Sequence, residues 1–184
     1  MRIYWDDTDK FAELLLYVAK ACESDPRFGA TKLNKILFFS DFISFRRRRK
    51  SITGATYMKL DHGPAPKCML PVRKTLIEEG HLAIQDADYY GRPQQRPIAL
   101  RQPNLEAFSG EDISIVDNVI RGLSEWNATQ VSELSHGFWW ELAEDKEDIP
   151  LAVSLVQIPD QVTESARKHG ESLEGDASRL ASTT

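Results

Sequence analysis

The sequence predicts a mainly helical α+β fold, with about five to six helices around a central hydrophobic helix and a small antiparallel β element. Two observations support this prediction. The stretch from Thr31 to Phe42 has a helical start signal but almost no polar face, and a helix that is apolar nearly all round is usually enclosed by other elements. Elsewhere, apolar residues recur at helical spacing, interrupted by two short β-prone runs.

The predicted central helix begins at Thr31, whose hydroxyl suits an N-cap. Its inward apolar residues, at helical spacing, are Leu33, Ile36, Leu37 and Ile43. Phenylalanines fill most of the remaining circumference, at positions 38, 39, 42 and 45. Asn34 and Asp41 are seven residues apart and share one face, so we predict that both are structural polar groups. One of them could bond the backbone of the loop at His62-Gly63, because an unpaired buried polar group costs about 1–3 kcal/mol.

The other helices are predicted from apolar spacing and from capping signals. They begin near Asp7, between Lys67 and Leu70, at Ser109, and at Asn127 or Thr129, and a last short helix is predicted around Phe138, Trp139 and Leu142. Residues 51–66 are predicted to form a short strand or extended segment and a loop. Two more strands are predicted at 81–84 and 97–100, joined by a long polar hairpin loop at 85–96.

The chain of 184 residues is long enough for one domain with tails. We predict a single globular domain over residues 1–158 and a polar, partly disordered tail over 159–184. Only Cys22 and Cys68 are present, so a disulfide framework is not expected, and a reducing cytoplasm is the predicted location. No run is long and apolar enough to span a bilayer, and no membrane partner is expected.

The net charge of −5 conceals a strong asymmetry along the chain. Residues 27–74 hold 12 Lys and Arg but only 2 Asp and Glu, whereas residues 75–184 hold 8 and 20 respectively. A basic block within an acidic chain indicates either an anionic partner or neutralisation of the two blocks by each other in the fold.

The sequence lacks the motifs of common catalytic and metal sites. It contains no CxxC, HExxH, GxSxG or glycine-rich phosphate loop. The candidate metal ligands His62, Cys68, His81 and His136 do not have the spacing of a metal site. We therefore predict that the protein is not an enzyme, that it has no catalytic residues, and that it uses no cofactor or metal.

Three motifs together resemble the Panacea (SocA-like) antitoxin domain. The first is the helix Lys32-Leu33-Asn34-Lys35-Ile36-Leu37-Phe38-Phe39-Ser40-Asp41, the second comprises Tyr57, Gly63 and Pro64, and the third comprises Ser135-His136 and Trp139-Trp140. The resemblance covers roughly residues 8–145. It implies an antitoxin that neutralises a cognate protein toxin by direct binding, or that delivers the toxin to a protease as an adaptor.

The residues that we assign to partner binding are Arg46, Arg47, Arg48, Arg49, His62 and Trp140. Five consecutive cations at 46–50 exceed what a helix C-terminus needs to complement its dipole. Exposed tryptophan is enriched at binding hot spots, and only one of two adjacent tryptophans on a helix fits into a single pocket.

The alternative function is a DNA-binding regulator, because helices followed by a two-stranded hairpin are typical of a winged helix. Its phosphate contacts would come from Lys67, Arg73 and Lys74 on the helix and from Arg92 and Arg96 on the hairpin. Pro66 and Pro71 argue against this alternative, because they crowd the start of the reading helix.

Overall fold

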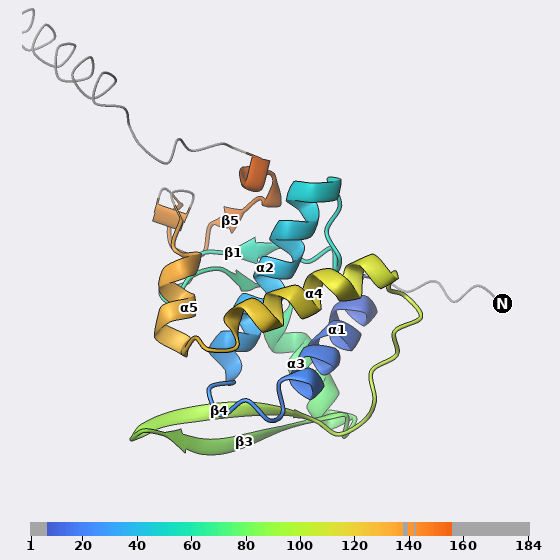
Figure 1. Cartoon of the computed structure of the whole chain (residues 1–184), viewed down its shortest axis with the longest axis vertical. Coiled ribbons are helices and arrows are strands. Elements are labelled where there is room, and N and C mark those ends of the chain that lie inside the picture. Colours follow the sequence, from blue (N-terminus) through green and yellow to red (C-terminus); the bar gives the residue numbers. More distant parts are fainter. Residues whose placement is uncertain (1–6, 138–139, 142, 156–184) are drawn as a thin grey trace, which may run out of the picture.

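The computed structural model describes residues 7–137, 140–141 and 143–155. Over these residues it is mainly helical, with five α-helices and a small amount of antiparallel β structure, which confirms the predicted fold class (Figure 1). The α-helices are α1 (Asp7–Ala21), α2 (Ala30–Arg48), α3 (Met69–Glu78), α4 (Gly110–Leu123) and α5 (Ala128–Ser135). A short 3-10 helix, η1 (Leu151–Leu155), follows them.

The β structure forms two small antiparallel sheets. One has the strand order β2 (Ala65–Pro66), β1 (Tyr57–Met58) and β5 (Asp148–Ile149), with Tyr57 opposite both Pro66 and Ile149. The other is the hairpin of β3 (Leu82–Tyr89) and β4 (Arg92–Ala99). Sequence-distant segments therefore meet at β1, which ties residues 148–149 to the chain that follows α2.

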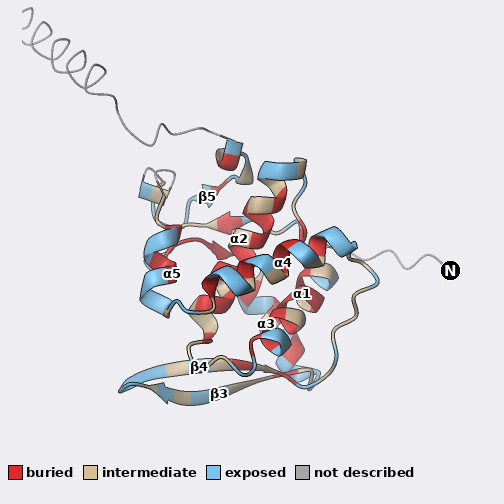
Figure 2. Ribbon diagram, in the orientation of Figure 1, coloured by how far each residue is buried: buried red, intermediate tan, exposed pale blue. Residues whose placement is uncertain are grey.

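Helix α2 is the centre of the domain, as the apolar stretch predicts. It packs against α1, α4, α5, β2, β4 and η1, and buried residues follow most of its length (Figure 2). Unexpectedly, this buried surface includes Lys32 and Lys35, whose exposed fractions are 1% and 2%. Lys32 Nζ donates to Asp25 Oδ2 at 2.6 Å, so its charge is compensated by a carboxylate from the turn before α2.

The helix starts agree with the capping signals at α4 and α5 but not at α2. Ser109 and Asp112 form a reciprocal capping box at α4, and Asn127 caps α5 with Gln130 as its partner. The prediction of Thr31 as the N-cap of α2 was wrong. Gly29 occupies that position without a side-chain cap, so the helix starts two residues earlier than the Thr31 hydroxyl suggested.

The predicted loop at 85–96 was also wrong. Strands β3 and β4 continue through it to a two-residue turn at Tyr90-Gly91, whose φ angles are both positive. The segment is largely polar because most of the ribbon faces solvent, so hydrophobic alternation could not reveal it. Arg96 fixes the ribbon to the body by donating to the carbonyls of Glu23 and Asp25, at 2.9 Å each.

The last short helix predicted around Phe138, Trp139 and Leu142 falls mostly outside the described residues, as does the predicted tail at 159–184.

Candidate functional site

The carboxylate of Asp41 organises the segment that follows α2. The Asp41 side chain is fully buried. Its Oδ1 accepts from the backbone N–H groups of Ile52 and Thr53, at 2.7 and 2.9 Å. Its Oδ2 accepts from the Thr53 hydroxyl and, at 2.7 Å, from the Tyr57 hydroxyl. One carboxylate thus holds both the turn after α2 and the start of β1.

Burial and hydrogen bonding act in opposite directions on this carboxylate. Burial raises the pKa of Asp41 above its ordinary value, while the hydrogen bonds from Thr53, Tyr57 and Ile52 oppose that rise. Burial and the neighbouring Asp41 also raise the pKa of the Tyr57 hydroxyl, which therefore stays a donor. The arrangement is a satisfied structural network, with no access from solvent to Asp41.

Lys35, one helical turn before the phenylalanines of α2, holds the loop at His62-Gly63-Pro64. Its Nζ donates to the Pro64 carbonyl at 2.8 Å. The prediction that Asn34 or Asp41 holds this loop was wrong for Asp41, which bonds the segment at 52–57 instead. A lysine can reach across this interface because its ammonium stands at the end of a long apolar stem.

Burial lowers the pKa of Lys35 to about 7. Because this pKa lies below the value of an unfolded lysine, the unfolded chain binds more protons than the folded chain above pH 7, and stability rises with pH in that range.

We therefore expect wild-type stability to rise by up to about 1.4 kcal/mol per pH unit relative to Lys35→Met as the pH increases above about 7. Chemical denaturation of both proteins at several pH values between about 6 and 8.5 measures this difference. Methionine keeps most of the apolar stem and loses the charge. The lost hydrogen bond to Pro64 therefore lowers the free energy of unfolding by the same amount at every pH of the experiment. Both proteins carry His136→Gln in this comparison, because Lys35 lowers the pKa of His136 and that histidine would otherwise titrate differently in the two. The remaining titrating groups are common to both proteins and cancel. Parallel pH profiles would contradict a titrating buried Lys35.

The loop held by Lys35 borders a pocket of about 460 Å³, which we call the motif pocket. Its lining residues are Thr31, Asn34, Lys35, Leu60, Asp61, His62, Gly63, Ala65, Asp145 and Lys146. The structure thus brings predicted residues Asn34 and His62 to one pocket. His62 is exposed there, and Asn34 is half-buried.

Trp140 lies against the same loop. Its ring stacks on His136 with 3.8 Å between ring centroids, and its Nε1 donates to the Leu60 carbonyl at 3.2 Å. Lys59 Nζ lies 4.4 Å from the centre of the Trp140 ring. Burial and nearby Lys35 lower the pKa of His136. Trp140 is therefore half-buried and already has several internal contacts, whereas Trp139 lies outside the described residues.

The four arginines at the end of α2 differ in their surroundings. Arg48 donates to Asp112 at 2.5 Å and to Glu111 at 3.2 Å, so it joins α2 to the start of α4. Arg46, Arg47 and Arg49 are exposed. Within the described residues their side chains form no ion pair, and the one bond is from Arg49 Nη1 to the Arg46 carbonyl. Three of the four are thus available to a partner.

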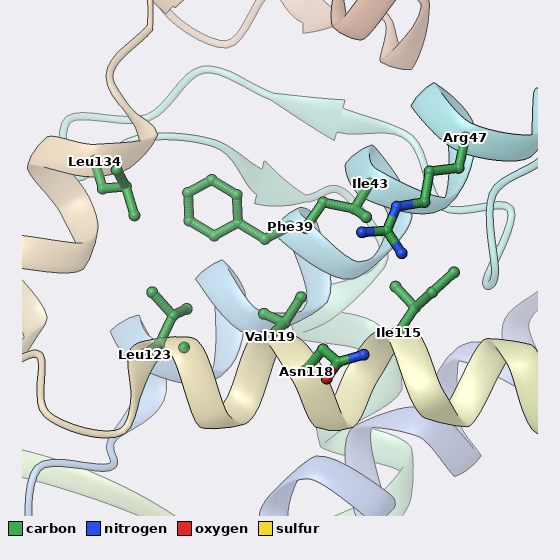
Figure 3. A pocket seen from close by; sticks show the side chains of 9 residues that line it. Phe39, Ile43, Arg47, Ile115, Asn118, Val119, Leu123 and Leu134 are labelled. Atoms are coloured by element: carbon green, nitrogen blue, oxygen red, sulfur yellow. The ribbon is translucent and has the colours of Figure 1, made fainter.

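An apolar groove lies beside these arginines, between α2, α4 and α5 (Figure 3). Its volume is about 280 Å³, and it is lined by Phe39, Ile43, Arg47, Ile115, Asn118, Val119, Gly122, Leu123 and Leu134. Arg47 and Leu134 lie at opposite ends of the groove in Figure 3. Sequence reasoning missed this groove, because its walls come from three helices whose contacts no local pattern encodes.

The cations of the DNA-binding alternative are distributed differently. Lys67 pairs with Asp148, Lys74 with Glu78 at 3.7 Å, and Arg96 anchors the ribbon to the turn before α2. Arg92 is exposed near the tip of the ribbon. Three of the five cations are therefore engaged within the chain.

The described part of the chain contains no helix that is both long and apolar enough to cross a membrane. Among the same residues, no three His, Cys, Asp or Glu side chains are grouped so that they could hold a metal ion.

The fold and these surfaces define a small helical domain with a buried polar centre and an open groove beside exposed arginines. A comparison with family models matches residues 33–141 to the family described as "Antitoxin SocA-like, Panacea domain". The match covers more than half of the chain, so the protein belongs to the SocA-like antitoxin (Panacea domain) family, as its motifs suggest. No curated protein and no solved structure matches the chain significantly.

Proposed function

We propose that this protein is an antitoxin that neutralises a cognate protein toxin by binding it directly, and that it has no enzymatic activity of its own. Membership of the SocA-like antitoxin family carries this proposal. The family description supports an antitoxin-like role. The partner and the mechanism are parts of the proposal.

The surface chemistry supports direct binding. Arg46, Arg47 and Arg49 are exposed cations on one helix end, and electrostatic attraction between such a cluster and an acidic surface raises the association rate. Delivery of the toxin to a protease would use the same first step, so direct binding is the property to test. The engagement of Lys67, Lys74 and Arg96 within the chain favours a protein partner over DNA.

We expect the combined variant Arg46→Ser, Arg47→Ser, Arg49→Ser to fold normally and to fail to rescue growth when the toxin is co-expressed. The lost cations would no longer attract an acidic surface of the toxin. The toxin to test is the product of the reading frame next to this gene. Arg48 is left intact because its two ion pairs with the start of α4 join the two helices.

The matched control is Arg92→Ser, which removes an exposed cation on the distant ribbon and should leave rescue intact. Association of the wild-type protein with its toxin should slow as salt is added, and the triple variant should lose most of that salt dependence. Full rescue of growth by the triple variant would show that these three arginines do not contribute to toxin binding. Rescue that persists while binding to the promoter fragment is lost would instead favour the DNA-binding alternative.

A further inference from the structure

The groove between α2, α4 and α5 is a mostly apolar hollow with one arginine in its lining. Its walls are mostly aliphatic and aromatic, and Leu134 at one end is 48% exposed. Phe39 and Ile43 on α2 are only half-buried, so their side chains face the opening as well as the core. A hollow with mostly apolar walls and a few polar groups is a common form of binding site.

The two ends of the groove differ in charge. Arg47 lines one end, and its side chain forms no ion pair or hydrogen bond within the described residues. Arg46 and Arg49, one and two positions away in the sequence, are also exposed. At the other end the lining residues are the uncharged Leu123 and Leu134. An acidic residue of an occupant is therefore favoured at the Arg47 end, where a cation lines the groove.

We infer that the groove binds an amphipathic segment of the toxin, with apolar side chains between α2, α4 and α5 and a carboxylate paired with Arg47. An amphipathic helix laid into a groove is a common mode of this kind, with anchors three and four residues apart. The inference rests on the proposed function, and it adds where the toxin docks and what chemistry its docking segment has.

The sharpest test fills the groove without disturbing the core. Gly122 lines the groove, and a Cβ added there would meet nothing within 4 Å. Gly122→Phe should therefore fold and obstruct the site. Gly110→Phe is the matched control, because Gly110 lies on the same helix, is equally open and does not line the groove. We expect Gly122→Phe to weaken toxin binding about tenfold or more, with little change for Gly110→Phe.

A second pair of variants tests the apolar wall. Leu134→Asp should weaken binding to a similar extent, whereas Leu70→Asp, at a leucine that is 66% exposed on α3, should not. Arg47→Glu should also weaken binding, and reversing one acidic residue of the toxin to lysine should restore it. Circular dichroism and thermal melting of each variant verify that it is folded.

A probe that needs no toxin gives an independent measurement. The dye 8-anilinonaphthalene-1-sulfonate combines apolar rings with one negative charge, so it matches both parts of the groove. Its fluorescence with the folded wild-type protein should fall in Gly122→Phe and Arg47→Glu and persist in Gly110→Phe. An unchanged signal in both groove variants would overturn the inference.

The outcomes separate this inference from the proposed function. Toxin binding that is equally tight for wild type, Gly122→Phe and Leu134→Asp overturns the groove as the docking site and leaves the antitoxin function standing. Failure of the wild-type protein to bind the toxin overturns the function itself. A wild-type dimer in solution that Gly122→Phe converts to a monomer would assign the groove to a second copy of this chain and overturn a toxin segment as its occupant.

Discussion

Replacing Asp41 with alanine should lower the free energy of unfolding by about 2–4 kcal/mol. The change strands two backbone N–H groups, at Ile52 and Thr53, and the hydroxyls of Thr53 and Tyr57, all of which donate to this carboxylate. Because the site is closed to solvent, water cannot replace the lost acceptor without local opening. Urea denaturation of wild type and variant measures the loss.

The matched control is Asp61→Ala, at an exposed aspartate on the rim of the motif pocket, which should change stability by less than about 0.5 kcal/mol. A double-mutant cycle of Asp41→Ala with Tyr57→Phe should show a coupling energy of about 1 kcal/mol, because the two groups share one hydrogen bond. Equal stability of Asp41→Ala and wild type would show that the 52–57 segment is held by its packing alone.

Gly63→Ala should be at least as damaging, with a loss of about 3 kcal/mol or more. Gly63 has a φ of +90°, which a residue with a side chain rarely adopts. An added Cβ would also stand 2.7 Å from Lys35 Nζ and 3.1 Å from the His136 ring, and it would collide with Ser135 Oγ. The variant must therefore displace the Lys35 ammonium and the Ser135 hydroxyl, which bond the carbonyls of Pro64 and Ser132, or move the loop away from α5.

Gly80→Ala separates the two causes of this loss. Gly80 also has a positive φ, of +72°, but a Cβ there would meet nothing within 4 Å. It should therefore lose only about 1–2 kcal/mol, from backbone strain. Thermal melting of the two variants side by side gives the comparison. A Gly63→Ala protein as stable as Gly80→Ala would mean that the surrounding side chains move aside at little cost.

Much of the architecture could be predicted from local patterns. The uninterrupted apolar surface after Thr31 identified the central helix, because a helix without a polar face must be covered on all sides. The capping signals at Ser109 and at Asn127 or Thr129 located the starts of α4 and α5, since capping depends on residues only three apart, and the structure selects Asn127. The family motifs were likewise readable from the sequence and are matched over residues 33–141.

The candidate site was less predictable, because its decisive contacts join residues far apart in the chain. The run of four arginines is uniform in the sequence, yet Arg48 alone meets Asp112 across 64 positions. Nothing in the local pattern distinguishes Lys35 from a lysine on a helix surface, yet it is buried and bonds the Pro64 carbonyl. Partners of this kind depend on the packing of α2 against its neighbours, which charge and periodicity do not specify.

The sequence by itself determined the fold class, the central helix, the cap of α4 and the family, because each depends on residues close together or on a motif. Only the tertiary structure decided which groups Asp41 and Lys35 bond, which arginines are exposed, and where an apolar groove remains open. Those properties arise when three or more elements pack together, and a side chain is paired or exposed according to what the neighbouring elements bring to it.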